Sequence, residues 1–263
     1  MKKTILVTGS TDGIGLETAK LLAAAGHLVL LHGRNADKLA RAAQSVGGDT
    51  ETYDGDLSRM SDVEAMAQAV SAKHARLDVL INNAGVFKTA DATTEDGLDA
   101  RFMVNTIAPY ALTRRLLPVM NSSGRVINLS SAAQATVNLD ALKGQVRLAD
   151  MDAYAQSKLA ITIWSRELAK ELPDGPVVVA VNPGSLLASK MVKEGFGVAG
   201  NDLSIGADIL VRAALSDEFS TASGKYFDND AGRFGEPHPD ALDPQKSGKI
   251  VSVIEEVLAK ITR

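Results

Sequence analysis

The stretch Thr8-Gly9-Ser10-Thr11-Asp12-Gly13-Ile14-Gly15, close to the start of the chain, decides the fold. The apolar run 5–7 precedes it, and apolar residues recur at helical spacing through 16–25. Glycines at such a junction let the backbone turn tightly and approach a pyrophosphate, and the following helix offers it unpaired amides. A glycine-rich connector that binds nothing is the alternative. The position directly after a first strand favours a nucleotide-binding turn, in which Gly9, Gly13 and Gly15 have G-x3-G-x-G spacing.

Strand and helix patterns alternate along the rest of the chain. Near-continuous apolar strands separated by helices predict a parallel sheet that is covered on both faces. Right-handed crossovers favour an α/β, doubly wound parallel sheet (Rossmann fold), and we expect a single domain over 1–263. The expected strands are 5–7, 28–31, 50–54, 78–81, 125–129, 177–181 and 224–227. The expected helices are 16–25, 36–46, 62–74, 99–120, 152–171, 204–215 and 250–261, with an irregular stretch at 232–248.

Composition and charge narrow the function classes. The net charge of −4 offers no basic surface for nucleic acid or an anionic membrane, so neither is an expected partner. The absence of cysteine excludes disulfides and thiol chemistry and suits a cytoplasmic location. The apolar run after Met1-Lys2-Lys3 ends at Gly9, which is too early for a signal peptide or a membrane span. The four histidines are well separated, and no metal site is expected.

The end of the second strand distinguishes between the two nicotinamide dinucleotides. NAD sites usually place an acid there to hold the ribose 2′-hydroxyl. This chain reads Leu31-His32-Gly33-Arg34, without a carboxylate. Arg34 could form a forked contact with a 2′-phosphate, although an arginine exposed on a loop is the simpler reading. The missing acid favours NADP(H) over NAD(H).

Several short motifs occur in one order along the chain. They are Thr8 to Gly15, Asp56-Leu57, Asn82-Asn83-Ala84-Gly85, Asn105, Ser130-Ser131, Tyr154-Ala155-Gln156-Ser157-Lys158 and Asn182-Pro183-Gly184. Each motif alone is weak, but together and in this order they resemble the short-chain dehydrogenase/reductase family. The long spacing between Ser131 and Tyr154 is most similar to the retinol-dehydrogenase-like branch. The resemblance covers the chain up to about Phe227.

The resemblance implies roles for particular residues around a nicotinamide dinucleotide. Asp56 and Leu57 would border the adenine, while Asn82, Ala84 and Gly85 would stabilise the central strand and pass behind the cofactor. Pro183 and Gly184 would lie near the nicotinamide. The expected cofactor-binding residues are Gly9, Ser10, Thr11, Asp12, Gly13, Ile14, Gly15, Arg34, Asp56, Leu57, Asn82, Ala84, Gly85, Tyr154, Lys158, Pro183 and Gly184. A threonine that often follows Pro-Gly in the family is missing; Ala188 stands there, and Ser189 could replace it only after a shift.

Tyr154 and Lys158 are four residues apart on a helical segment, so they share one face. An ammonium beside a phenol favours the phenolate, and we expect Lys158 to lower the pKa of Tyr154 so that it can act as a general acid and base. By resemblance, Ser131 would donate a hydrogen bond to the substrate oxygen and Asn105 would anchor a water that links Lys158 to solvent. The expected catalytic residues are therefore Asn105, Ser131, Tyr154 and Lys158.

Three segments are expected to form the substrate pocket: the insert 132–151, the loop 186–203 and the tail 228–263, together with 87–94. They contain Leu139, Leu142, Leu148, Leu186, Met191 and Phe196, so an apolar carbonyl or alcohol is the expected substrate. Trp164 is expected in the core or an interface.

The leading hypothesis is an NADP(H)-dependent oxidoreductase that acts on CH–OH donors or the matching carbonyls. A catalytically silent NADP-binding regulator or scaffold on the same fold is the alternative, although such proteins generally lose the tyrosine or the lysine. A lyase or epimerase that uses the cofactor transiently is a third possibility. By resemblance, a homo-oligomer (dimer or tetramer) would pair through the helices 99–120 and 152–171.

Overall fold

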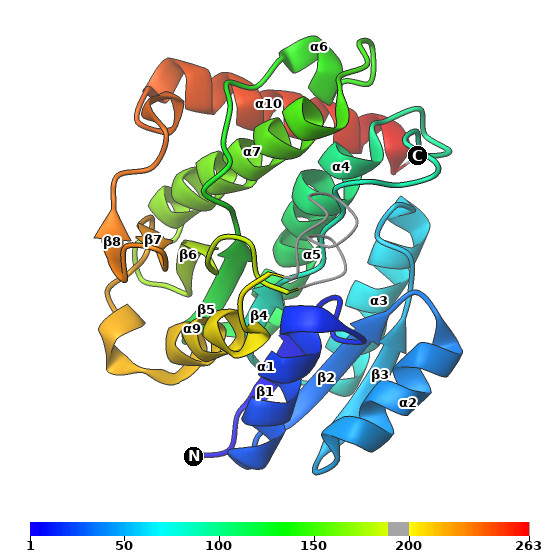
Figure 1. Ribbon diagram of the computed structural model, residues 1–263, viewed down its shortest axis with the longest axis vertical. Coiled ribbons are helices and arrows are strands. Elements are labelled where there is room, and N and C mark those ends of the chain that lie inside the picture. The colour runs from blue at the N-terminus through cyan, green and yellow to red at the C-terminus, as the bar shows by residue number, and fades with distance from the viewer. Residues whose placement is uncertain (189–199, 263) are drawn as a thin grey trace.

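The computed structural model describes residues 1–188 and 200–262, which form an eight-stranded sheet with helices on both faces (Figure 1). The strand order is β3-β2-β1-β4-β5-β6-β7-β8. Every neighbouring pair is parallel except the last, in which β8 runs antiparallel to β7. The strands are β1 (Thr4–Val7), β2 (Leu28–Gly33), β3 (Thr50–Asp54), β4 (Leu77–Asn82), β5 (Met120–Leu129), β6 (Val177–Asn182), β7 (Tyr226–Asp228) and β8 (Arg233–Gly235). The predicted doubly wound α/β class is confirmed.

Two apolar layers hold the helices against the sheet. The helices are α1 (Gly13–Ala24), α2 (Ala36–Val46), α3 (Met60–Lys73), α4 (Ala100–Phe102), α5 (Ala108–Leu116), α6 (Leu139–Leu142), α7 (Asp150–Glu171), α9 (Leu203–Leu215) and α10 (Pro244–Ile261). Along β1, Leu6 faces the layer beneath α3, α5, α7 and α10, whereas Ile5 and Val7 face the layer beneath α1, α2 and α9. Because side chains alternate along a strand, a strand that is apolar at every position must be covered on both faces.

The prediction of one continuous helix over 99–120 is wrong. After α4 the chain makes a π-helical turn over Met103–Ile107, continues as α5, and enters β5 already at Met120. Pro109 lies in the first turn of α5 and has no N–H with which to continue the i→i−4 ladder, which accounts for the wider turn before it. Pro118 ends the helical run for the same reason.

The stretch 232–248 is more regular than expected. Phe234 on β8 pairs with Phe227 on β7, and both rings pack against Phe219 with centroids 5.0–5.1 Å apart. Further along, α10 begins at Pro244 rather than 250, because Asp243 accepts hydrogen bonds from the first free amides and Pro244 suits the first turn. The Asp243-Pro244 pair is itself a local signal for a helix start, and the predicted start at 250 is too late.

Helix α10 lies across α7 and reaches α5. Its residues Ile250, Val253, Ile254 and Val257 are buried in the same apolar layer as Trp164. Tyr110 on α5 donates a hydrogen bond of 2.8 Å to Glu255 on α10. Part of the surface through which these helices were expected to pair between subunits is therefore covered by the chain itself. Among the described helices, none has the length and apolar content needed to cross a membrane.

Candidate active site

The glycine turn between β1 and α1 has the backbone that a close approach requires. Gly9 and Gly13 have φ of 65° and 58°, which disfavour any residue with a Cβ. A Cβ at Gly15 would lie 2.4 Å from the carbonyl oxygen of Gly9 and 2.3 Å from the Nδ2 of Asn83. Asp12 caps α1, whose first amides lie at the carboxyl edge of the sheet. This geometry fits the pyrophosphate of a dinucleotide.

Three side chains that were not among the expected site residues hold this turn. The Nδ2 of Asn83 donates to the carbonyl oxygens of Thr8 and Gly9 at 2.8 and 3.1 Å. The Thr8 hydroxyl accepts from the backbone N–H groups of Asn83 and Ala84 at 3.0 and 3.1 Å. His32 accepts from the Gly9 N–H through Nδ1 at 3.0 Å. Asn83 lay inside a motif that pointed to it, whereas nothing in the sequence pattern singled out His32.

Asn82 supports the site from the interior of the protein. Its Nδ2 donates to Thr113 Oγ1 at 3.1 Å and to Asn128 Oδ1 at 2.8 Å, and the Asn128 amide donates to Ser165 on α7 at 2.8 Å. This buried network ties β4 and β5 to α7. Asn82 therefore positions the central strands, and its amide nitrogen contacts protein groups.

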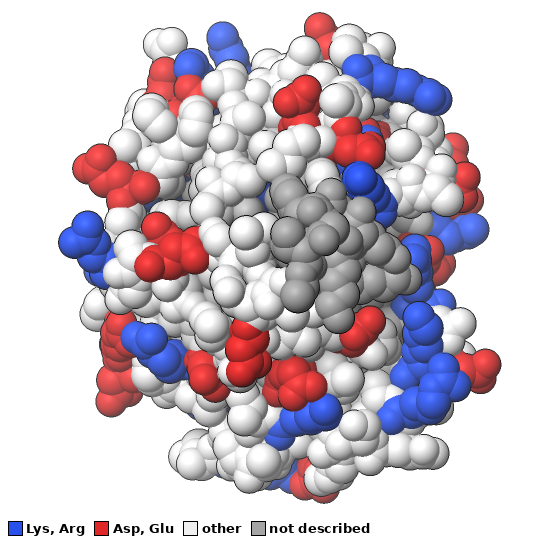
Figure 2. All heavy atoms as spheres, viewed as in Figure 1, with Lys and Arg blue, Asp and Glu red and all other residues white. Residues whose placement is uncertain are grey.

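At the adenine end, Arg34 stands beyond β2 with 71% of its side chain exposed. Its guanidinium lies 4.0 Å from the Asp56 carboxylate, and Leu57 is buried next to it in the chain. A Cβ on Gly33 would lie 2.4 Å from the Thr11 methyl group, so the turn and the end of β2 are in close contact. Figure 2 shows Lys and Arg side chains gathered on the side of the molecule where α2 lies. Helix α2 itself carries the exposed Lys38 and Arg41.

Helix α7 carries Tyr154 and Lys158 to the ends of the central strands. A side-chain hydrogen bond joins Tyr154 to Ser131, which follows β5. The Lys158 Nζ donates to the carbonyl oxygen of Leu129 at 2.7 Å and lies 5.7 Å from the centre of the Tyr154 ring. The Phe87 ring packs edge-on against Tyr154 with 5.3 Å between centroids. The three expected residues Ser131, Tyr154 and Lys158 are therefore together.

The pKa of Tyr154 differs from expectation. Burial raises it above its ordinary value of 10.0, and the hydrogen bond with Ser131 acts in the opposite direction. Burial also lowers the pKa of Lys158, to about 8, and its ammonium faces the Tyr154 ring and the Leu129 carbonyl. The phenol is thus protonated at neutral pH, which suits an acid that delivers a proton to a carbonyl oxygen.

Asn105 lies in the π-helical turn, and its side chain is fully used. Its Oδ1 accepts from the Val86 N–H at 2.8 Å, and its Nδ2 donates to the Val86 carbonyl oxygen at 2.9 Å and to Ser157 at 3.0 Å. The amide therefore anchors the segment after Gly85 to the residue before Lys158. Its expected role in holding a water near Lys158 stays a prediction.

The tail contributes side chains to the Pro183-Gly184 turn. The Nδ2 of Asn229 donates to the Pro183 carbonyl oxygen at 2.9 Å, and Asp230 accepts from the Ser185 N–H at 2.8 Å. Gly184 has a φ of 119°, a conformation that side chains rarely adopt. Asn229 and Asp230 were missed because they lie some 45 residues along the chain from the turn they hold. Ala188 is followed by residues outside the described part of the chain, which include Ser189.

The insert 132–151 is only partly available to a substrate. Leu142 is fully buried, and Leu139 and Leu148 pack against the same apolar core, so Leu142 is not a pocket residue. Leu186 remains 46% exposed beside the Pro183-Gly184 turn. Met191 and Phe196 lie outside the described residues. Trp164 is fully buried in the core.

The site brings together a cradle for phosphates, a proton donor and a hydrogen-bond donor at the same edge of the sheet. Within residues 1–188 and 200–262, no group of three His, Asp or Glu side chains could hold a metal ion. A nicotinamide dinucleotide fits the close-packed glycines, the N-terminal end of α1 and the exposed Arg34. Tyr154 and Lys158 are then placed to meet its nicotinamide.

Comparison with known proteins agrees with this geometry. The family model for short chain dehydrogenases matches residues 3–196. Human retinol dehydrogenase 13 is 32% identical over 94% of this chain and 82% of its own length. Mouse retinol dehydrogenase 12 is 35% identical over 86% of this chain and 77% of its own. The solved structure of landomycin C-6 ketoreductase LanV with bound NADP and rabelomycin is 30% identical, with a TM-score of 0.68 over 86% of this chain and 94% of that one.

Proposed function

The chain belongs to the short-chain dehydrogenase family, and we propose from this that it uses NADP(H) in preference to NAD(H) to interconvert an apolar carbonyl compound and its alcohol. That it is an NAD(P)-dependent oxidoreductase of alcohol or carbonyl groups follows from the family and its relatives. The choice of cofactor and substrate is the proposal. The observation that carries the choice of cofactor is the largely exposed Arg34 just after β2, a strand that ends without the acid that would hold a ribose 2′-hydroxyl.

The residues of the site perform the acid–base part of the reaction. When bound, the nicotinamide ring supplies or accepts the hydride at the substrate carbon. In reduction, the Tyr154 hydroxyl donates its proton to the carbonyl oxygen, and the Ser131 hydroxyl donates a hydrogen bond to the same oxygen where charge develops. Lys158 holds the ribose and, as a cation, favours the phenolate that Tyr154 leaves behind. In oxidation the same groups act in reverse.

The preference for NADP(H) is supported by Arg34. Its guanidinium is largely exposed and makes only a 4.0 Å contact with Asp56, so it can turn to a 2′-phosphate without breaking a strong ion pair. β2 ends at Gly33 without the acid that would hold a ribose 2′-hydroxyl. Solved relatives with bound NADP include LanV and a short chain dehydrogenase from Burkholderia cenocepacia that is 26% identical, with a TM-score of 0.71.

Steady-state kinetics with both cofactors test this preference. We expect Arg34→Gln to lower kcat/KM for NADPH by about 10- to 100-fold, the value of a charge-assisted hydrogen bond, while NADH is little affected. Arg41→Gln is the matched control, because Arg41 is an exposed arginine on α2 of the same basic side. Equal rates of the wild-type protein with the two cofactors would refute the proposal.

An apolar substrate is supported by the exposed Leu186 at the mouth of the site and by the Phe87 ring against Tyr154. The names of relatives point the same way, since they include retinol dehydrogenases and a human polyprenol dehydrogenase that is 32% identical over 87% of this chain. A panel of aldehydes, ketones and alcohols of increasing chain length tests it. kcat/KM should rise with apolar length, and a preference for short polar compounds would contradict the proposal.

A homo-oligomer and a cytoplasmic location stay predictions. Because α10 packs on α7 and bonds to α5 through Glu255, part of the expected pairing surface is covered, and a dimer through α5 and α7 would use the part that remains. Light scattering of the purified protein gives the mass, and fractionation of the cells that produce it gives the location.

A further inference from the structure

Arg101, in the short helix α4, is a cation buried beside the active site. Its side chain is only 2% exposed. A guanidinium removed from water needs a partner for each of its donors, or the charge is strongly unfavourable. The Asp99 carboxylate accepts hydrogen bonds from Arg101 Nε at 2.8 Å and from Nη2 at 2.6 Å. This contact is the main reason that the pKa of Arg101 is raised. One donor nitrogen, Nη1, is directed elsewhere.

The Nη1 of Arg101 reaches two segments that meet the catalytic tyrosine. It donates to the carbonyl oxygen of Phe87 at 3.4 Å and forms an ion pair with Asp150. The Phe87 ring packs against Tyr154 at 69° between ring planes. Asp150 is the first residue of α7, about one helical turn before Tyr154. A single side chain thus contacts both the loop that packs on the phenol and the helix that carries it.

Asn105, one helical turn after Arg101, also holds the backbone of the loop that follows the NNAG motif. It bonds both backbone groups of Val86, while Arg101 bonds the carbonyl of Phe87. Residues four apart on a helical segment share a face, so two consecutive residues after the NNAG motif are held from one side. The backbone at Val86 and Phe87 is therefore held by α4 and the π-helical turn.

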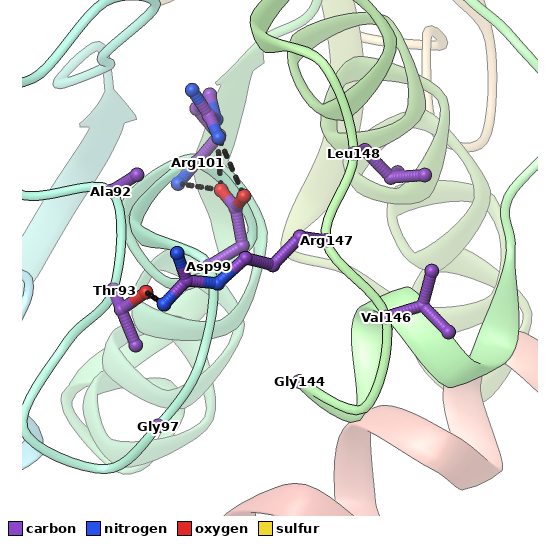
Figure 3. Close-up of a pocket in the computed structure, with 9 residues that line it drawn as sticks. All are labelled: Ala92, Thr93, Gly97, Asp99, Arg101, Gly144, Val146, Arg147 and Leu148. Carbon is purple, nitrogen blue, oxygen red and sulfur yellow. Dashed lines mark hydrogen bonds and ion pairs between the residues drawn. The ribbon is translucent and has the colours of Figure 1, made fainter.

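Arg101 also lines a pocket of about 140 Å³ between the segments 92–99 and 144–148. Figure 3 shows Arg101 and Asp99 facing one another, while Arg147 extends towards Thr93, whose hydroxyl it contacts at 3.3 Å. Among the charged residues that line this pocket, Arg101 is paired with Asp99, and Arg147 contacts the Thr93 hydroxyl. The contacts of Arg101 thus lead towards Tyr154 rather than to a bound ligand.

We propose that Arg101 is a positioning residue that sets the placement of Tyr154, through the Phe87 carbonyl on one side and Asp150 on the other. The inference rests on the proposed function, because it assigns a role within the same site. It predicts that loosening the link to α7 changes the chemical step and leaves cofactor binding and folding in place.

Asp150→Ala tests the link with little risk to the fold, because Asp150 is 49% exposed and the buried fork with Asp99 remains. Asp152→Ala is the matched control, since both are acids in the first turn of α7. We expect Asp150→Ala to lower kcat by about three- to tenfold relative to Asp152→Ala, the size of one partly exposed charge-assisted contact. The KM for NADPH and the melting temperature should be equal in the two variants.

A second measurement needs no turnover. Tyrosine labelled at the ring carbon that bears the hydroxyl gives four resonances, and the one lost in Tyr154→Phe reports on Tyr154. A shift of this resonance in Asp150→Ala but not in Asp152→Ala supports the inference. Equal kcat values and equal spectra for the two variants would overturn it. If the wild-type protein turns over nothing in the substrate panel, the proposed function fails, and the resonance still decides the role of Arg101.

Discussion

The His32 side chain offers a sharp test of how the glycine turn is held. Its Nδ1 accepts from the Gly9 N–H at 3.0 Å, so Nε2 carries the ring proton and donates to the Gly55 carbonyl oxygen at 3.1 Å. The imidazole is therefore neutral and joins the phosphate-binding turn to the segment before Asp56. His32→Leu leaves both backbone groups without this partner, and we expect it to lower the free energy of unfolding by about 1–3 kcal/mol.

His32→Asn separates the hydrogen bond from the titration. Its Oδ1 stands where Nδ1 stood, so it can accept from the Gly9 N–H, but it cannot gain a proton. We expect His32→Asn to recover about 1 kcal/mol of the loss in His32→Leu, and to bind NADPH about five- to tenfold more tightly than His32→Leu. Chemical denaturation and fluorescence titration with NADPH measure the two quantities.

The pH dependence of stability has a definite sign. Burial lowers the pKa of His32 below its ordinary value of 6.5, against the opposing effects of the Gly55 carbonyl and of Asp56 and Asp54. The unfolded chain then binds a proton at a higher pH than the folded one, so the stabilisation is complete above 6.5 and is lost as pH falls towards the folded pKa. His27 also has a lowered pKa, so the difference between the wild-type protein and His32→Asn isolates His32.

Two results would refute this reasoning. If the difference in unfolding free energy between the wild-type protein and His32→Asn is constant between about pH 5 and 7.5, His32 does not titrate with folding. If His32→Leu also binds NADPH as tightly as the wild-type protein, the imidazole does not hold the turn.

Three further variants test the rest of the site. Tyr154→Phe should lower kcat by about 10²- to 10⁴-fold and leave NADPH affinity unchanged, and retained turnover would exclude Tyr154 as the proton donor. Lys158→Met should abolish turnover yet raise the unfolding free energy at pH 7 by about 2 kcal/mol, because the buried ammonium has its pKa lowered to about 8. That gain should shrink as pH rises from 8 towards the ordinary 10.5, because only the unfolded lysine is then protonated, and a constant gain would contradict the assignment. Gly15→Ala should weaken NADPH binding at least about tenfold, because its Cβ would lie 2.4 Å from the Gly9 carbonyl oxygen, whereas Gly248→Ala on α10, with nothing within 4 Å, should bind normally.

Much of the fold was predictable because its signals are local. Fully apolar strands separated by amphipathic helices require a sheet covered on both faces, and the structure has that architecture. The failures were at chain positions where two local signals compete. The apolar pattern of 99–120 reads as one helix, but Pro109 and Pro118 interrupt it, and Asp243-Pro244 starts a helix inside a stretch rich in turn residues.

The catalytic side chains were predictable for a similar reason. Tyr154 and Lys158 share a helix, so their spacing alone places them on one face. Their environment could not be predicted in this way. The direction of the Tyr154 pKa depends on burial by segments that are distant along the chain, and burial outweighs the opposing effect of Ser131.

The amino-acid sequence by itself determined the strand and helix order, the glycine turn and the identity of the reacting groups. Each of these depends on residues that are close together in the sequence. The tertiary structure alone decided which groups support them: His32 on the glycine turn, Arg101 on Phe87 and Asp150, and Asp230 on Ser185. These contacts join residues that folding brings together from different strands and helices, and no periodicity along the chain encodes such a meeting.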